Sequence, residues 1–134
     1  MELCNSTIGN NFIYLDQTTS TMDISRKYSN DSRNDGLVVF AEHQTKARGR
    51  LGRDWISQQN QNITFSILVY PDSEMINQLT IASSVIIARF LESIDLVPQI
   101  KWPNDVLVNK RKIAGILVES LHQENIPTSA IIGI

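Results

Sequence analysis

The sequence has very little cysteine and no long apolar run, and both shortages narrow the class of protein. Cys4 is the only cysteine among 134 residues, so the chain cannot form an internal disulfide. This favours a reducing compartment, and we interpret Cys4 as a bystander near a mobile chain end. No apolar segment approaches the roughly 20 residues that a membrane span needs, and the polar start is not a signal peptide. The sequence therefore predicts a cytoplasmic protein with no membrane partner.

An excess of positive charge is also missing. The 12 lysines and arginines are outnumbered by 14 aspartates and glutamates, which gives a net charge of -2 at pH 7. A domain that holds DNA through its surface charge is usually basic, so we expect no DNA partner. The length and the 42% hydrophobic fraction are ordinary for one globular domain, and we treat residues 1–134 as one unit.

The spacing of apolar residues predicts an α+β fold. A short helix is expected after Ser20 and Thr21, and a longer helix after Asp72 or Ser73 that ends before Pro98. The predicted sheet is mixed and mainly antiparallel, with the helices packed on one face, because hairpins occur late in the chain. Strands are predicted over residues 11–15, 37–41, 63–70, 99–102, 106–108, 113–118 and 130–134, with a hairpin turn over 109–111.

Two predictions concern the core. The long helix carries apolar residues at helical spacing, which we interpret as its core-facing stripe: Met75, Leu79, Ala82, Ile86 and Phe90. Trp102 is expected in the core as well.

The last five residues have the pattern of a buried strand, and natural domains seldom end in one. We therefore expect an incomplete domain, cut short at its carboxyl end.

Residues 46–53, Lys-Ala-Arg-Gly-Arg-Leu-Gly-Arg, combine four cations with two glycines. Glycine lets a backbone approach a ligand closely, and arginine offers a planar fork that fits phosphate or carboxylate oxygens. Local chemistry leaves three interpretations open: a solvated basic surface, a nucleic-acid-binding loop, or a site for a small phosphate ligand. Trp55 supplies either a flat face for a purine or a core anchor.

Two further segments carry candidate chemistry. In Lys101-Trp102-Pro103-Asn104-Asp105, the last two side chains either bind Mg²⁺ together with substrate phosphates or satisfy a local Asx turn. Lys112 opens an apolar strand, where a lysine is often only an edge residue. Gly115 in the middle of that strand weakens it unless something comes close to the backbone. A ligand that lies over Gly115 with its charged end at Lys112 would explain why a glycine and a lysine occur at these positions.

Together these segments resemble the biotin–protein ligase (biotin–acetyl-CoA-carboxylase ligase) family. Ser20-Thr21 is similar to a family pair at the first helix, and Gln44 to Trp55 resembles Gln-x-x-Gly-Arg-Gly-Arg-x-Gly-Arg-x-Trp. Lys101 to Asp105 matches Lys-Trp-Pro-Asn-Asp, and Lys112 to Glu119 resembles Lys-x-x-Gly-Ile-Leu-Val-Glu. The final Gly-Ile is similar to the start of a Gly-Ile-Asn motif. The resemblance implies an incomplete class II aminoacyl-tRNA-synthetase-like (biotin–lipoate ligase) fold without an N-terminal DNA-binding domain.

The resemblance also implies a reaction. Biotin and ATP, with Mg²⁺, form biotinyl-5′-AMP, and a lysine of a biotin carboxyl carrier protein domain then takes the biotin. No tightly bound cofactor is implied, and a homodimer is compatible with the family. The implied catalytic residues are Arg50 and Lys112, and Asp105 is the implied metal ligand. The implied biotin site contains Ser20, Thr21, Met22, Gln44, Arg48, Gly49, Arg50, Lys112 and Gly115. The implied ATP or adenylate site contains Arg50, Arg53, Trp55, Asn104, Asp105 and Lys112.

One residue departs from the family pattern, and two other functions stay open. Ala47 stands where the family usually has glycine, and a methyl group there costs roughly 1 kcal/mol or more if the position needs a positive φ. The alternatives are an enzyme that attaches lipoate or octanoate, and a catalytically incompetent fragment that only binds ligands.

Overall fold

The computed structural model describes residues 7–59 and 61–134, so Cys4 lies outside the described residues. No helix in that part of the chain is long and apolar enough to cross a membrane. The elements in chain order are β1 (Phe12–Thr18), α1 (Thr21–Lys27), η1 (Ser32–Asn34), β2 (Val38–Gln44), η2 (Arg50–Gly52), β3 (Thr64–Val69), η3 (Ser73–Gln78), α2 (Leu79–Glu92), β4 (Pro98–Lys101), β5 (Asp105–Val108), β6 (Arg111–Gly115), β7 (Leu117–Gln123) and β8 (Ile126–Gly133).

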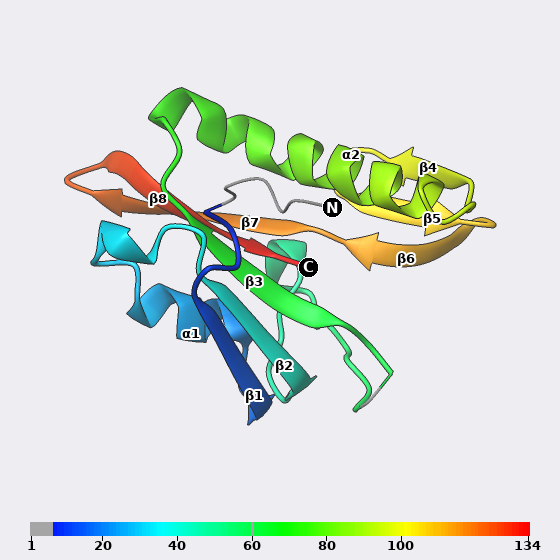
Figure 1. Cartoon of the computed structure of the whole chain (residues 1–134), viewed down its shortest axis with the longest axis horizontal. Coiled ribbons are helices and arrows are strands. Elements are labelled where there is room, and N and C mark those ends of the chain that lie inside the picture. Colours follow the sequence, from blue (N-terminus) through cyan, green and yellow to red (C-terminus); the bar gives the residue numbers. More distant parts are fainter. Residues whose placement is uncertain (1–6, 60) are drawn as a thin grey trace.

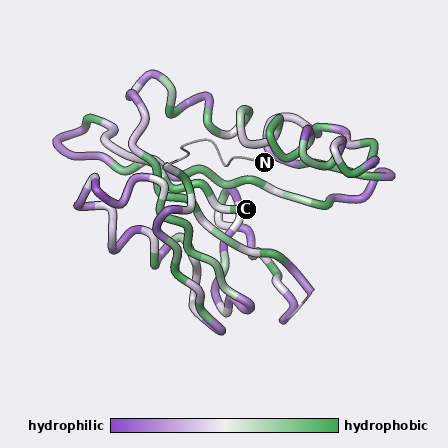
Figure 2. Tube along the Cα trace, in the orientation of Figure 1, coloured by the Kyte–Doolittle hydropathy of each residue, from purple (hydrophilic) through white to green (hydrophobic). Residues whose placement is uncertain are grey.

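Two sheets organise the chain (Figure 1). The larger has five strands in the order β1-β2-β3-β8-β7, and the smaller has the order β4-β5-β6. Among the described strands, only β1 and β2 pair in parallel, and the other pairs are antiparallel. The predicted α+β class with a mixed, mainly antiparallel sheet is confirmed. The hydrophobic colour in Figure 2 follows the strands, whereas the tight turns are hydrophilic.

The two helices lie on opposite faces of the larger sheet, which differs from the predicted single face. Successive strand residues point to opposite faces. Leu68 and Ile131 pack with Met22 of α1, whereas Ile132, the next residue of β8, packs with Leu91 of α2. The central strands are apolar on both faces, so each face is buried by its own layer of packed elements. The small sheet and α2 form the second layer, visible above the larger sheet in Figure 1.

The predicted core-facing stripe of the long helix is wrong at four of its five positions, and only Leu79 packs against the core. Residues 73–78 form a 3₁₀ turn, and α2 begins only at Leu79. Ile86 and Phe90 are 67% and 62% exposed, whereas the buried face carries Ser84, Ala88 and Leu91. Because α2 is apolar around most of its circumference, the spacing alone could not identify the buried face. The small side chains at 84 and 88 let α2 lie close to the small sheet.

Residues 101–118 connect the two sheets. The predicted strand over 113–118 is divided into β6 and β7, and the chain passes from the small sheet to the large one at Ile116, whose amide donates to the Asn104 carbonyl at 2.8 Å. The predicted hairpin turn is confirmed, with positive φ at Asn109 and Lys110. Trp102 is 76% exposed at the β4–β5 turn, so its expected place in the core is wrong.

Candidate functional site

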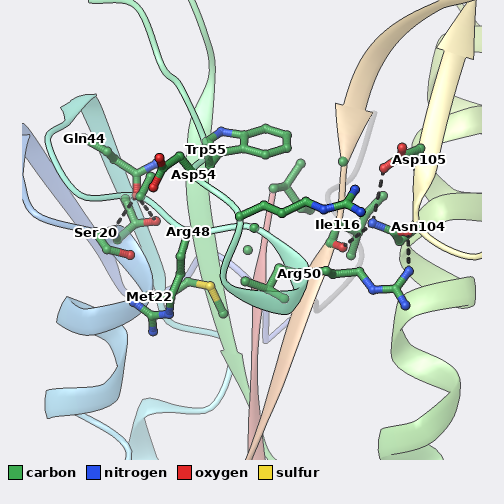
Figure 3. A pocket seen from close by; sticks show the side chains of 18 of the residues that line it. Ser20, Met22, Gln44, Arg48, Arg50, Asp54, Trp55, Asn104, Asp105 and Ile116 are labelled. Carbon is green, nitrogen blue, oxygen red and sulfur yellow. Dashed lines mark hydrogen bonds between the residues drawn. The ribbon is translucent and has the colours of Figure 1, made fainter.

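The first wall of the site forms where β1 and β2 end. Because these strands are parallel, their carboxyl ends meet at one edge of the sheet. Ser20 and Thr21, at the start of α1, therefore lie beside Gln44, the last residue of β2. All three side chains are buried at the base of a cavity (Figure 3).

Gln44 is fixed by hydrogen bonds that leave its amide nitrogen available. Its Oε1 accepts from the Thr21 amide at 2.8 Å and from the Thr21 hydroxyl at 3.1 Å. The Thr21 hydroxyl also contacts the Ser66 hydroxyl at 2.6 Å. With Oε1 engaged on both sides, the NH₂ group is the part of Gln44 that is left to donate to a polar ligand.

The loop of residues 45–55, which contains the arginine–glycine segment, folds on itself through main-chain hydrogen bonds. The Trp55 amide donates to the Ala47 carbonyl at 3.2 Å, and the Gly49 amide donates to the Arg53 carbonyl at 2.7 Å. Positive φ values occur at Leu51 and Gly52, whereas Gly49 has a φ of -101°. The glycine at 52 is therefore the one that uses the freedom of its residue type.

Ala47 adopts an ordinary backbone conformation. The described non-glycine residues with positive φ include Leu51 but not Ala47. The strain that a left-handed conformation would impose on an alanine does not arise here. Its methyl group borders the cavity, so Ala47 affects the shape of the site rather than the backbone geometry of the loop.

Arg48 ties this loop to α1 and β7. Its Nε and Nη2 donate to the two carboxylate oxygens of Glu119 at 2.8 and 3.0 Å, and its Nη1 donates to Asp23 at 2.7 Å. Arg26 binds the same Glu119 carboxylate at 2.6 Å. Hydrogen bonding to Arg48 lowers the pKa of Glu119, and the bond to Glu119 raises the pKa of Arg48. The guanidinium of Arg48 thus binds three carboxylate oxygens of the protein.

The second wall comes from β5 and β6, where a β-bulge sets the direction of Lys112. Asp105 pairs with Gly115 and Leu107 pairs with Lys112, so Ile113 is an extra residue without a partner across the ladder. The bulge brings Lys112 to the same side as Asp105 and Gly115, although regular alternation would separate them. Lys112 Nζ lies 2.8 Å from Asp105 Oδ1 and 4.9 Å from the centre of the Trp55 ring.

Gly115 is required by this close approach. A Cβ atom at this position would lie 2.7 Å from Lys112 Nζ and 2.9 Å from Trp55 Cη2. The protein's own side chains come near the backbone of Gly115, and the ligand expected over this residue stays a prediction.

Arg50 bridges the two walls. Its Nη1 donates to Asn104 Oδ1 at 2.7 Å, and Asn104 Nδ2 donates to Asp105 at 3.2 Å and to the Ile116 carbonyl at 3.3 Å. The buried Ser84 hydroxyl donates to the Pro103 carbonyl at 3.2 Å, which ties α2 to this turn. The side chain of Asn104 therefore bonds to the loop and to the chain that follows β6. The two cations at this end of the cavity are Arg50 and Lys112, and each has a polar partner.

A cavity of about 320 Å³ lies between the walls, within the range of small-molecule sites. Every residue implied by the sequence lines it: Ser20, Thr21, Met22, Gln44, Arg48, Gly49, Arg50, Arg53, Trp55, Asn104, Asp105, Lys112 and Gly115. The sequence did not identify several other lining residues, which are Ala47, Leu51, Asp54, Phe65, Ile116, Leu117, Gly133 and Ile134. A glycine at 133 is needed because Met22 Sδ would lie 2.8 Å from a Cβ there.

Asn104 and Asp105 are oxygen donors of the cavity that could hold a metal ion together with phosphate oxygens. No group of three or more His, Cys, Asp or Glu side chains in residues 7–59 and 61–134 is arranged to hold a metal. Asp105 already pairs with Lys112, which reduces its free negative charge. Magnesium is usually held by one or two carboxylates together with phosphate oxygens, and Asp105 with Asn104 fits that role.

Comparisons with known proteins agree on one family. Residues 14–134 match the family described as the Biotin/lipoate A/B protein ligase family. A bifunctional ligase/repressor BirA of Bacillus spizizenii is 36% identical over 130 residues, which are 95% of this chain and 40% of that protein. A biotin–[acetyl-CoA-carboxylase] ligase of Mycobacterium tuberculosis is 35% identical over 111 residues, or 77% of this chain and 42% of that protein.

Solved structures show the same similarity. The biotin protein ligase of Leishmania major in complex with biotinyl-5-AMP has a TM-score of 0.78 and 29% identity, over 92% of this chain and 56% of that chain. The biotin protein ligase of Aquifex aeolicus in complex with biotin and ATP has a TM-score of 0.70 and 32% identity, over 92% and 50% of the two chains. The chain thus spans about 40% of the curated relatives and about half of the structural ones.

Proposed function

Since this chain belongs to the Biotin/lipoate A/B protein ligase family, we propose that it forms the biotin- and ATP-binding part of a biotin–protein ligase catalytic domain. One observation carries the proposal: a single cavity has amide and hydroxyl groups at one end and two cations at the other. A molecule with a neutral, hydrogen-bonding head and an anionic tail fits this polarity. Biotinyl-5′-AMP, the ligand named for the Leishmania major enzyme, has that character.

The proposed first step joins biotin to AMP. A carboxylate oxygen of biotin attacks the α-phosphorus of ATP, the bond from that phosphorus to the β-phosphate bridging oxygen breaks, and pyrophosphate leaves. In the second step, the amine of a carrier-domain lysine attacks the biotinyl carbonyl carbon, AMP leaves, and the amine loses a proton. The chain's contribution is to align two anions and offset their repulsion.

Gln44, Ser20 and Thr21 hold the ureido head of biotin in this proposal. The Gln44 amide is already oriented by Thr21, so binding the ureido group costs little side-chain entropy. Met22 supplies an apolar surface next to Gly133, and the backbone of Arg48 and Gly49 covers the bicyclic ring.

Arg50 and Lys112 bind the reacting carboxylate and phosphate. Their charged groups contact Asn104 and Asp105, and in this proposal ligand oxygens replace these partners. Arg53 lies on the loop beside the nucleotide, and the Trp55 ring that now contacts Lys112 stacks on adenine. Asn104 and Asp105 would hold the Mg²⁺ that accompanies ATP, and this ion would neutralise phosphate charge.

The first prediction tests these roles by titration calorimetry with biotinyl-5′-AMP. Arg50→Ala and Lys112→Ala each remove a charge-assisted hydrogen bond, which is worth roughly tenfold or more in affinity. Arg33→Ala is the matched control, because Arg33 pairs only with the neighbouring Asp31 at the exposed start of η1. Wild-type affinity in both cavity variants, or no binding by the unmodified chain, contradicts the proposal.

Lipoate attachment is the second candidate because the matched family description includes lipoate. Lipoic acid lacks a ureido group, so it leaves the Gln44 amide without a ligand partner, and an unpaired buried polar group is costly. We expect lipoyl-5′-AMP to compete with biotinyl-5′-AMP at least tenfold more weakly. Equal competition favours the lipoate function, and binding of both adenylates without turnover favours the incompetent-module alternative.

A further inference from the structure

The side chains of Arg48 and Arg50 bind residues outside the loop of residues 45–55. In the proposed complex, the contact of Arg50 changes and the contacts of Arg48 do not. Arg50 binds Asn104 inside the cavity, where the proposed ligand phosphate takes over the contact. Arg48 binds Glu119 with two nitrogens and Asp23 with a third. When Arg50 turns to the ligand, the ion pairs of Arg48 (the tether) remain, and the start of the loop is also held by hydrogen bonds from residues 45 and 46 to the carbonyls of residues 18 and 19.

Glu119 belongs to the rigid part of the molecule. It pairs with Ile131 in the β7–β8 ladder, and its neighbours at 117 and 121 pack in the core cluster under α1. Its side chain is 23% exposed, and its carboxylate is also bound by Arg26 of α1. A bidentate pair between an arginine fork and a partly buried carboxylate restricts both distance and orientation. The cluster contains two cations and two carboxylates, with Asp23 as the second acid, so its charges balance.

We infer that Glu119 is a positioning residue for the proposed reaction. Through Arg48 it holds the backbone of Gly49 and Arg50 at a fixed height over the cavity while Arg50 exchanges Asn104 for the ligand. Its carboxylate contacts arginines rather than the ligand. The tether is a property of the loop itself, whereas its effect on biotinyl-5′-AMP rests on the proposed function.

Limited proteolysis tests the tether without any ligand. Lys46, Arg48, Arg50 and Arg53 make the loop a trypsin substrate, and cleavage requires it to leave its folded conformation. Glu119→Gln weakens the tether, and we expect loop cleavage to become about tenfold faster. Arg26→Ala is the matched control, since it removes the other ion pair of Glu119 and leaves both contacts of Arg48 intact.

The same variants are then titrated with biotinyl-5′-AMP. Glu119→Gln should bind about tenfold more weakly, with the loss appearing in affinity, and Arg26→Ala should stay within about twofold of wild type. If Glu119→Gln does not fold, Arg48→Lys serves instead, because lysine keeps the charge and the trypsin site but cannot form the two-nitrogen contact.

Wild-type cleavage and wild-type affinity in Glu119→Gln, or in Arg48→Lys, overturn the inference. An Arg26→Ala variant that matches Glu119→Gln also overturns it, because the effect then comes from general loss of charge in the cluster. Faster loop cleavage in Glu119→Gln, combined with no ligand binding even by the unmodified chain, supports the tether and refutes the proposed function instead.

Discussion

At the scale of single residues, Gly115 shows how a missing side chain shapes the site. Lys112 crosses its Cα, and the Trp55 ring closes the same space, so a methyl group would lie 2.7 to 2.9 Å from three of their atoms. Lysine is flexible and can move away, but only by giving up its ion pair with Asp105 at 2.8 Å. A methyl group at position 115 would therefore displace the ammonium group of Lys112.

Gly115→Ala therefore tests the geometry of Lys112. We expect biotinyl-5′-AMP to bind roughly tenfold or more weakly, because both Lys112 and Trp55 must shift, while the unfolding temperature changes by only a few degrees. Calorimetry and thermal unfolding measure the two effects. Arg111→Ala, an exposed substitution on the same strand outside the cavity lining, should change neither. Unchanged affinity in Gly115→Ala would mean that the position of Lys112 over Gly115 is irrelevant to binding.

The sequence identified 13 of the 21 residues that line the cavity, but not the contacts between them. Positions such as Gln44, Arg50 and Lys112 can be recognised because they lie in ordered motifs that resemble the family, whereas their local chemistry leaves several interpretations open. The partners Glu119 of Arg48 and Asn104 of Arg50 are 71 and 54 residues away. Such pairs depend on how the sheets are placed, which a single sequence does not encode in any short pattern.

At the scale of elements, the cluster joining α1, the loop and β7 makes stability depend on pH. Hydrogen bonding to Arg48 lowers the pKa of Glu119 below its ordinary value of 4.5. The stabilising effect of the ionised carboxylate is fully present above pH 4.5 and is lost as the pH falls through the lower folded-state pKa. Arg26 and Arg48 are the charged groups that bind it, and Asp23 binds the same Arg48.

Denaturant unfolding across the acid range measures this contribution. The unfolding free energy of wild type should exceed that of Glu119→Gln above pH 4.5, and the difference should shrink as the pH falls below that value. Comparing the two proteins removes the acid response of other groups, including Asp31, whose pKa is also lowered. A difference that is constant or grows on acidification would show that Glu119 does not titrate in this way.

The sequence predicted most of the segments that form helices and strands, but not which face of a helix is buried or where a strand is irregular. Alternation and helix spacing gave the correct class at most positions. The bulge at Ile113 is invisible in sequence, yet it alone turns Lys112 toward Asp105. The β7–β8 hairpin was missed because its turn residues Glu124 and Asn125 both adopt positive φ without any glycine. Local propensity is overridden there by pairing of the flanking strands.

At the scale of the whole molecule, the site lies between two layers that have separate cores. One core packs α1 on the larger sheet, and the other packs α2 and the small sheet on its opposite face. Gln44 belongs to the first layer, and Asp105 and Lys112 belong to the second. Arg50 is the loop residue that joins them across the cavity (Figure 3). A ligand that fills both ends therefore links the layers.

Amide hydrogen exchange measures which parts of the two cavity walls a ligand contacts. Under the proposed function, biotin alone contacts the Gln44 wall and reaches Lys112 and Gly115 of β6 with its carboxylate end, whereas biotinyl-5′-AMP also contacts Asn104 and Asp105. At equal saturation, both ligands should slow amide exchange near the end of β2, but only the adenylate should strongly slow it in residues 104–108. Lys112→Ala should weaken that second effect while keeping the first. Equal protection of residues 104–108 by biotin and by the adenylate would mean that Asn104 and Asp105 do not recognise the nucleotide half.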